Sequence, residues 1–364
     1  MKIIDSYILK KFLISFFFCI ILFTAIVVVI DISEKTDDFS KSGLAAWDIV
    51  RLHYFGFIPR IDALLFPLFV FISVIFFTAK MADRSEIIAI LSSGVSFKRF
   101  LLPYWVGSIF LALILWLGYL FVLPKANAVW GDFETKYIDV NFGSVENKSM
   151  PSNFYFKLDT NTYAGLHSYD TTSKIGTYFF VQKFISNKLI YNLRSENVTW
   201  DTLNKKWKLF NVMERFFVGE KETIRHTKSV TMNYDFKPSD LQRDSYLKDR
   251  LPNKELEALI KKTQKMSGAS GVKELLVERY NRDAIPVSVI ILSLIGAILS
   301  SRKVRGGSGF HLAVGVILSV TYILFGRFSL VFATKGNMPP LLAAWVPNIL
   351  FGILAFYLYK RFSK

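Results

Sequence analysis

Residues 12–30 read FLISFFFCIILFTAIVVVI, an apolar run that contains no Asp, Glu, Lys or Arg. A helix needs about 20 such residues to cross the roughly 30 Å hydrocarbon core of a bilayer. The run is longer than the apolar region of most signal peptides, and the next residues, DISE at 31–34, offer no small-residue cleavage site. We therefore expect an uncleaved transmembrane helix here.

Five more apolar runs of similar length follow along the chain. Hydrophobic residues make up 52% of the sequence and charged residues 20%, against about 25% charged residues in an average soluble domain. This composition excludes a wholly soluble or disordered protein. The second run contains Asp62, and the fifth contains His311 and Arg327. We predict an α-helical integral membrane protein with six transmembrane helices, at residues 12–30, 61–79, 100–123, 284–301, 310–332 and 339–359.

The loops between these runs differ in charge. If the N-terminus lies inside the cell, the loops and termini on that side are richer in Lys and Arg than the two short loops on the other side. Cytoplasmic loops of membrane proteins carry this excess, so we expect both termini in the cytoplasm. Topology then accounts for much of the formal charge of +16. Because no zinc-finger spacing or RNP-like motif is present, we expect no nucleic acid partner.

A long polar insertion separates the third and fourth runs and would lie outside the cytoplasm. Residues 230–236 read VTMNYDF and alternate at the period of a β-strand. Similar runs predict seven or eight antiparallel strands that form a sandwich or jelly roll. Asn253 is placed to cap a helix that ends near Lys265. The expected regions are transmembrane helices 1–3 at 1–123, an inserted periplasmic β jelly-roll domain at 124–250, a helical connector at 251–283 and transmembrane helices 4–6 at 284–364.

Common catalytic motifs are missing from the sequence. There is no G-x-x-x-x-G-K-[ST] loop for ATP, no H-E-x-x-H zinc motif and no G-x-S-x-G nucleophile elbow. The single cysteine, Cys19, excludes a disulfide framework, and the four histidines are scattered. We expect a transport or scaffold component that is not an enzyme and needs no cofactor or metal.

Three stretches together resemble a known family. They are ADRSEIIAILSSGVS at 82–96, ERYNRDAIP at 278–286 and NMPPLLAAWVPN at 337–348. Each is similar to a segment of the lipopolysaccharide export permease family LptF/LptG. The first follows the family pattern S-E-[LI]-x-A-L-x-x-x-G-x-S, with Ile90 where Leu is usual and Leu91 after it. The resemblance covers essentially the full chain, because the order and spacing of the spans and of the insertion also agree.

The resemblance implies a permease subunit of an ATP-driven ABC transporter, which extracts lipopolysaccharide from the inner membrane of a Gram-negative bacterium. It implies a sister permease subunit, with which the chain forms an LptF/LptG heterodimer. A separate cytoplasmic ATPase dimer would hydrolyse ATP. A periplasmic bridge protein of the same jelly-roll type would accept the lipid from the chain's own periplasmic β jelly roll and pass it toward the outer membrane.

The loop at 82–96 is the expected contact with the ATPase. Its sequence predicts a short amphipathic helix at 85–93, with Ile87, Ile88, Ile90 and Leu91 toward one side. From the residues alone, a helix resting on lipid headgroups explains this pattern as well. With the resemblance, we expect a coupling helix at about 83–94 in which Glu86 meets a basic residue. Its candidate contacts are Arg84, Glu86, Ile87, Leu91 and Gly94.

Two further sets of residues are candidates for lipid contact. Basic side chains near the outer leaflet either anchor the helices at the interface or bind the phosphates of lipid A. These are Lys35, Lys41, Arg51, Arg60 and Arg327. Apolar residues of the β domain are expected to line a groove for acyl chains, and these are Phe154, Phe156, Val230, Met232, Tyr234 and Phe236.

Two other classes of protein stay open at this point. One is a membrane subunit of another ABC-type system, for lipoprotein release or mechanotransmission, although such subunits usually place the large domain after the first span. The other is a secondary transporter. Carboxylates inside the membrane mark the proton and ion pathways of transporters, and the predicted spans have almost none.

Overall fold

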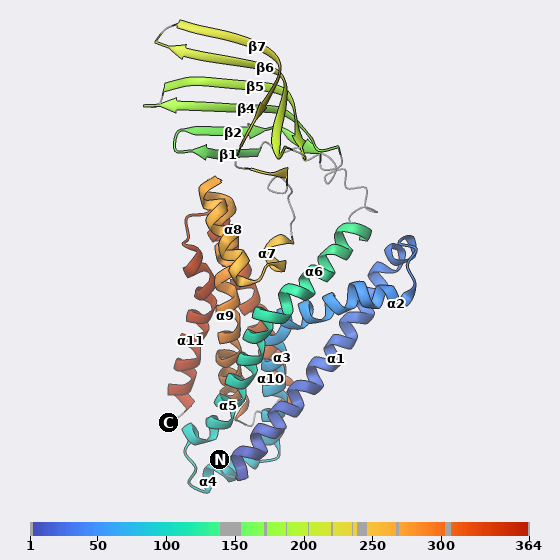
Figure 1. The fold of residues 1–364 in the computed structure, drawn as a ribbon. Helices are drawn as coiled ribbons and strands as arrows, with labels where there is room; N and C mark the ends of the chain where they lie inside the picture. The colour runs from blue at the N-terminus through green and yellow to red at the C-terminus, as the bar shows by residue number, and fades with distance from the viewer. Residues whose placement is uncertain are drawn as a thin grey trace. The chain divides into compact units, whose positions relative to one another are not determined.

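The computed structural model comprises two compact units, which we describe separately (Figure 1). The helical unit contains Met1–Glu134, Lys248–Leu256 and Lys273–Lys364, and the β domain contains Thr135–Leu247 and Glu257–Val272. The structure describes residues 3–138, 154–170, 173–186, 188–202, 204–219, 221–234, 236–238, 246–266, 269–302 and 307–362.

Six of the described helices are long and apolar enough to cross a membrane, which confirms the six predicted spans. Three π-helical segments extend or link them: η1 (Val50–Tyr54), η2 (Gly118–Val122) and η3 (Glu134–Ile138). The helical segment that contains the third span therefore continues beyond residue 123, as far as Ile138. The helices are α1 (Ile3–Lys41), α2 (Ala46–Ile49), α3 (Phe55–Asp83), α4 (Glu86–Ser92), α5 (Phe97–Leu117), α6 (Leu123–Phe133), α7 (Leu247–Arg250), α8 (Asn253–Met266), α9 (Ala269–Ser300), α10 (Gly307–Lys335) and α11 (Pro340–Phe362).

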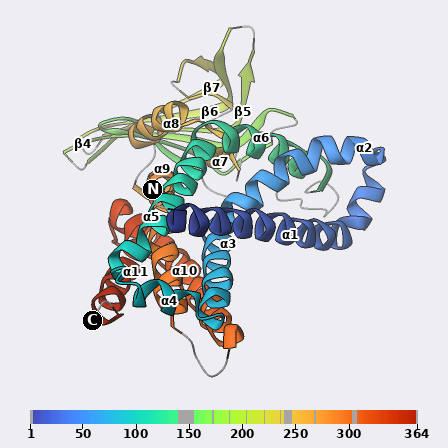
Figure 2. The same cartoon turned by 90° about the horizontal axis from the view of Figure 1, so that it is seen from below.

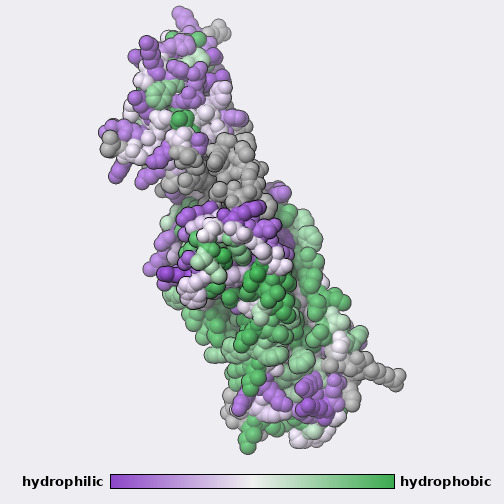
Figure 3. All heavy atoms as spheres, turned by 90° about the vertical axis from the view of Figure 1, so that its right-hand side faces the viewer, coloured by the Kyte–Doolittle hydropathy of each residue, from purple (hydrophilic) through white to green (hydrophobic). Residues whose placement is uncertain are grey.

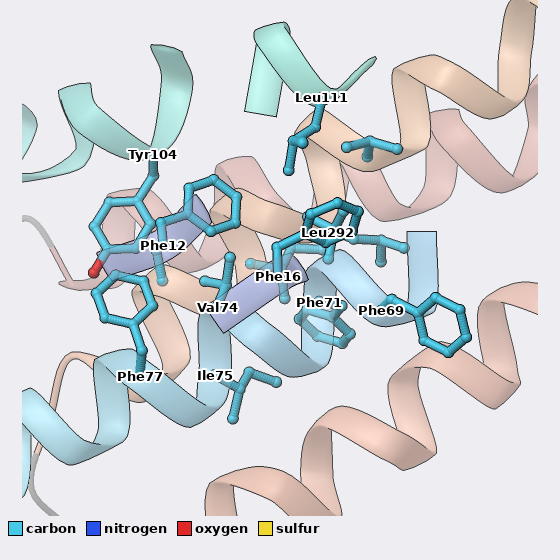
Figure 4. Packing of buried hydrophobic residues seen from close by; sticks show 14 of the residues in the cluster. Phe12, Phe16, Phe69, Phe71, Val74, Ile75, Phe77, Tyr104, Leu111 and Leu292 are labelled. Atoms are coloured by element: carbon cyan, nitrogen blue, oxygen red, sulfur yellow. The ribbon is translucent and has the colours of Figure 1, made fainter. Parts of the chain in front are cut away.

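Aromatic side chains fill the core of the helical unit. Helix α1 packs against α3 and α5 (Figure 2), and the Phe12 and Phe16 side chains of α1 are buried in the contact (Figure 4). The Phe12 ring stacks on Phe77 at a centroid distance of 6.3 Å, and Phe16 meets Phe66 at 4.9 Å. A Cβ atom at Gly107 of α5 would come within 2.6 Å of the Phe12 ring. Glycine is therefore required for this close approach.

The outer surface of the helical unit is also apolar. Large hydrophobic side chains are exposed on several helices, and on α1 Phe18 is 63% and Ile21 69% exposed. Figure 3 shows a broad hydrophobic zone on this unit, with hydrophilic side chains at its ends. Water solvates such an apolar surface poorly, whereas the acyl chains of lipids solvate it well. The chain is therefore a multi-pass membrane protein.

The β domain contains a seven-stranded antiparallel sheet, inserted between the helices as expected. The neighbours in the sheet follow the order β1-β2-β4-β5-β6-β7, and β3 pairs with β4. A jelly roll has two sheets with Greek-key connections, so the described strands confirm an antiparallel β domain but not its jelly-roll topology. The strands are β1 (Phe154–Asp159), β2 (Thr162–Leu166), β3 (Ser168–Asp170), β4 (Ile175–Ile185), β5 (Lys188–Asp201), β6 (Lys206–Val218) and β7 (Lys221–Met232).

The strand expected at residues 230–236 is only partly present. Strand β7 ends at Met232, and Phe236 lies beyond it. The Trp207 Nε1 atom donates a hydrogen bond of 2.8 Å to the Phe236 carbonyl oxygen, and the two rings stack at 4.9 Å. This contact, and not the pairing of strands, directs the chain after β7 into the core of the domain. The predicted end of the strand was therefore wrong, although the predicted inward face was correct.

Candidate functional site

Helix α4 forms the surface expected to contact the ATPase. Its side toward the helical unit holds Ile87, which is 1% exposed, and the partly buried Ile90 and Leu91. The predicted place of Ile88 on this side was wrong, because Ile88 is 55% exposed. The spacing of 87, 90 and 91 follows the helical turn, whereas residue 88 lies about 100° away from 87. Helix α4 therefore presents an exposed apolar side chain to its surroundings.

Local contacts fix both ends of α4. The Tyr7 hydroxyl donates to Glu86 Oε2 at 3.1 Å, and Arg84 Nη1 lies 4.0 Å from Glu86 Oε1. Ser85, before the helix, and Gly94, after it, both have positive φ angles of 60° and 85°. Glycine tolerates this conformation and so ends the helix, as the sequence predicted. The Glu86 carboxylate is thus held in place at the first turn.

Lys35 belongs to a buried polar cluster. Its ammonium group contacts the Glu134 carboxylate and lies 3.7 Å from Asp31 Oδ1. Asp31 Oδ2 also accepts a hydrogen bond from the Tyr54 hydroxyl (3.0 Å) and lies 2.9 Å from His53 Nε2. The His53 side chain is fully buried, and its Nδ1 atom lies 3.8 Å from Glu134 Oε1. Two carboxylates therefore share the positive charge of Lys35, which is not free to bind phosphate in this arrangement.

Arg60 is also engaged within the helical unit. Its Nη1 atom donates to Asp249 Oδ2 at 3.1 Å and to Asn127 Oδ1 at 3.2 Å. Its guanidinium group lies 4.1 Å from the centre of the Trp130 ring, a cation–π contact. These contacts join α3, α6 and α7, and they give Arg60 a structural role.

The other three basic candidates are exposed. Lys41 ends α1, Arg51 lies in η1 and Arg327 lies in α10. None of them forms an ion pair with another described residue. The structure therefore divides the five candidates into two cations paired inside the protein and three that remain available to an anionic ligand.

Two of the three stretches that carry the family resemblance meet in the helical unit. Asn348 Nδ2 donates to the Ala284 carbonyl oxygen at 2.7 Å, and Tyr322 donates to Asn348 Oδ1 at 2.9 Å. Arg282, only 2% exposed, donates to Glu278 and to the Lys248 and Leu251 carbonyl oxygens at 2.7 to 3.2 Å. These hydrogen bonds hold α9 against α11 and against the segment that leads into α8.

Four of the acyl-groove candidates lie in or beside the core of the β domain. Val230, Met232 and Tyr234 are partly buried and pack against this core, and Phe236 is 1% exposed. Burial and the nearby Glu214 carboxylate raise the pKa of Tyr234, so its hydroxyl is neutral at physiological pH. Phe154 and Phe156 lie on β1, the strand at the other edge of the sheet; the described residues do not include their side chains.

Sequence reasoning missed the polar cluster and Arg282. His53 and Glu134 look isolated because they stand far apart in the sequence. A sequence signal existed only at Asp31 and Lys35, a pair at i,i+4 immediately after an apolar run. Among the described residues there is no group of three or more His, Cys, Asp or Glu side chains arranged to hold a metal ion. The Lys35 ammonium group and the Asp31 and Glu134 carboxylates of the cluster form an ion-pair network.

Comparison with known proteins gives one family. A search of curated proteins found no match. The family described as lipopolysaccharide export system permease LptF/LptG matches residues 6–361, which is nearly the full chain and includes all six spans and the β domain. The family description names a permease of an export system, so the chain is a transporter subunit that acts within a complex. The chain belongs to the LptF/LptG family of lipopolysaccharide export permeases.

Proposed function

We propose that the chain is one permease subunit of an ATP-driven lipopolysaccharide extractor in the inner membrane. Both termini and α4 would face the cytoplasm, and the β domain would face the periplasm. The sister permease would complete the membrane part, and a separate ATPase dimer would supply the energy. The observation that carries this proposal is α4, a short surface helix with an exposed face, in a chain that belongs to a family of export permeases.

The geometry of α4 supports docking of the ATPase. Ile87 anchors the helix, while Ile88 and Ala89 are exposed beside Glu86. An apolar side chain with a neighbouring carboxylate suits a groove that has an apolar floor and a basic rim. A helix that only rested on lipid headgroups would gain from basic residues on its polar face, yet 86–93 contains none.

The exposed cations support recognition of the lipid headgroup. We propose that Lys41, Arg51 and Arg327 bind phosphate groups, since Lys and Arg form charge-assisted hydrogen bonds with phosphate oxygens. Lys35 and Arg60 already have carboxylate partners. Lys35 would bind phosphate only if the lipid displaced a carboxylate, so we expect it to contribute mainly through the polar cluster.

The β domain supports the transfer of acyl chains. Each CH₂ group exposed to water costs about 0.8 kcal/mol, so a lipid with about sixty acyl methylenes would cost roughly 50 kcal/mol. A periplasmic protein surface must therefore shield these chains. The inward side of the sheet is apolar, and β1 and β7 leave its two edges unpaired with other described strands. We propose that acyl chains enter along these edges and bind beside Val230 and Met232.

The test is co-purification of the ATPase with the permease pair from membranes. Ile88→Ser and Glu86→Gln should each lower recovery of the ATPase and lipid-stimulated ATP hydrolysis at least several-fold. Both side chains lie at the surface, so insertion and thermal stability should be retained. Lys10→Gln, which removes an exposed charge near the same end of the bundle, is the matched control. Full ATPase recovery with Ile88→Ser and Glu86→Gln would refute docking through α4.

A further inference from the structure

One line of residues crosses strands β4, β5, β6 and β7 of the β domain and reaches the junction of β2 and β3. The antiparallel registers of β4 with β5, β5 with β6 and β6 with β7 each omit one pair, while the pairs on both sides remain. The omitted positions align from strand to strand, and the line begins between β2 and β3, which pair with β4 on either side of His167. We call this the fold line; its residues are His167, Tyr178, Glu196, Asn211 and Lys228.

The spacing of buried residues along the strands changes at the fold line. Along a regular strand, inward residues lie two apart. Across the line the step is three from β2 to β3 and within β4, β5 and β6: Leu166 to Tyr169, Gly176 to Phe179, Ser195 to Val198, and Leu209 to Val212. Each strand thus places two successive residues outward at the same level. This arrangement bends the sheet (Figure 1) and lets its two halves share one hydrophobic core.

The backbone at the line is unusual as well. Tyr178 and Asn211 both have a φ angle of 50°, in a region that residues with a side chain seldom adopt. Ser195 provides side-chain hydrogen bonds where the ladder is broken. Its Oγ atom accepts from the Phe210 amide at 3.1 Å and lies 2.6 Å from the Phe210 carbonyl oxygen. The bend is therefore fixed by specific contacts.

A pocket of about 510 Å³ lies on the outward side of this bend. Arg194, His226 and Lys228 line it, and none of the three forms an ion pair with a described residue. The Tyr178 ring, 68% exposed, forms one wall. Glu196 accepts a hydrogen bond of 2.7 Å from Asn211 Nδ2, which fixes both polar side chains.

We propose that this pocket binds a saccharide that carries phosphate or carboxylate groups. Arg194 and Lys228 would bind the anionic group, as charge-assisted donors do. The Tyr178 ring offers an apolar face to the C–H face of a sugar, and Glu196 and Asn211 can bind hydroxyl groups. An apolar ligand would leave these polar groups unpaired, and a bare phosphate would leave the aromatic wall unused. The volume is within the usual range for small-ligand pockets.

The inference deepens the proposed function and rests on it, because it assigns the polar part of lipopolysaccharide to the outward side of the sheet. The acyl chains would remain on the inward side. One sheet would then hold the two chemically different parts of one lipid on its two faces.

The test uses the full-length chain in nanodiscs and core oligosaccharide released from lipopolysaccharide by mild acid, which carries anionic groups but no acyl chains. Binding is measured by isothermal titration or thermophoresis. Arg194→Gln/Lys228→Gln should weaken binding at least five-fold, and Tyr178→Asn, which tolerates the positive φ angle, about as much. Tyr178→Phe should retain binding. The matched control, Lys188→Gln/Lys221→Gln, removes two exposed charges at the far hairpins of the same sheet and should bind like the original.

Three results would overturn the proposal. The first is an equal weakening of oligosaccharide binding by the control pair, which would mean that the overall charge of the domain alone causes the binding. The second is competition by inorganic phosphate at the same concentration as the saccharide, which would mean a simple anion site. The third is unchanged binding by all pocket variants. Crosslinking of intact lipopolysaccharide at Met232 separates a failure of the saccharide site from a failure of the proposed function. If pocket variants bind the oligosaccharide normally and still crosslink the lipid at Met232, the saccharide site is refuted and the proposed function stands.

Discussion

The helical unit and the β domain distribute polarity in opposite ways. In the helical unit, Phe18 and Ile21 are exposed while His53 and Arg282 are buried. In the β domain, Trp207 is fully buried and Arg194 and Lys228 are exposed. The helical unit exposes apolar side chains, which lipid solvates, and the β domain exposes polar side chains, which water solvates. Both cores contain buried aromatic rings, but of Arg282, Arg194 and Lys228 only Arg282, in the helical unit, is a buried charged side chain.

The largest effect is expected at the aromatic core of the β domain. Trp207→Ala removes a side chain that contacts Trp200, Tyr169 and Phe236 and leaves a cavity. Such truncations cost about 3–5 kcal/mol. We expect the free energy of unfolding of the β domain to fall by this amount, measured by pulse proteolysis of the full-length chain in urea.

The control is Trp47→Ala on α2, whose side chain is 70% exposed. It should leave the urea midpoint of the β domain unchanged. A small effect of Trp207→Ala, comparable with this control, would mean that the rings are not a cooperative core.

A second large effect is expected at Arg282 in the helical unit. Arg282→Gln removes the cation that neutralises Glu278 and leaves the Lys248 and Leu251 carbonyl oxygens without their donor. Breaking a buried ion pair on one side costs about 3 kcal/mol. The apparent melting temperature of the helical unit should drop clearly in a detergent thermal-shift assay.

The matched change in the β domain is Arg215→Gln, because Arg215 pairs with Glu222 and both side chains are more than a third exposed. Exposed ion pairs contribute about 0–1 kcal/mol, so this variant should lose little stability. Equal losses at Arg282 and Arg215 would remove the distinction drawn between the two units.

The smallest effect is expected at the fold line. Ser195→Ala removes the hydroxyl that bonds to the Phe210 backbone and so leaves buried polar groups unpaired. We expect a loss of about 1–2 kcal/mol in the unfolding of the β domain, with faster hydrogen exchange at the Phe210 amide. Ser229→Ala, an exposed serine on β7, should change neither quantity. Exchange that stays slow in Ser195→Ala would show that the bend does not depend on this side chain.

Much of the fold was predictable because it follows from periodicity. The six spans, the β domain between them and the inward side of Val230, Met232 and Tyr234 all depend on local alternation or on run length. The end of β7 was not predictable, because the contact between Trp207 and Phe236 joins positions 29 residues apart. The place of Ile88 was misjudged since apolar residues that follow one another closely do not show which of them face the protein.

The candidate site was predictable in composition but not in pairing. The residues at 82–96 indicate a short helix through their apolar spacing and the glycine that follows it, and α4 lies at 86–92. The five basic candidates look alike in the sequence. The structure separates them, because Glu134 and Asp249, distant in the chain, neutralise Lys35 and Arg60.

The sequence by itself determined that this chain spans a membrane six times and carries one β domain, because both properties follow from which residues stand within one helix or strand length of each other. The tertiary structure decided which charges are paired and where the sheet bends. A fold line exists only when His167, Tyr178, Glu196, Asn211 and Lys228 are brought into register. Their alignment depends on hydrogen bonds between strands, and no single strand contains that information.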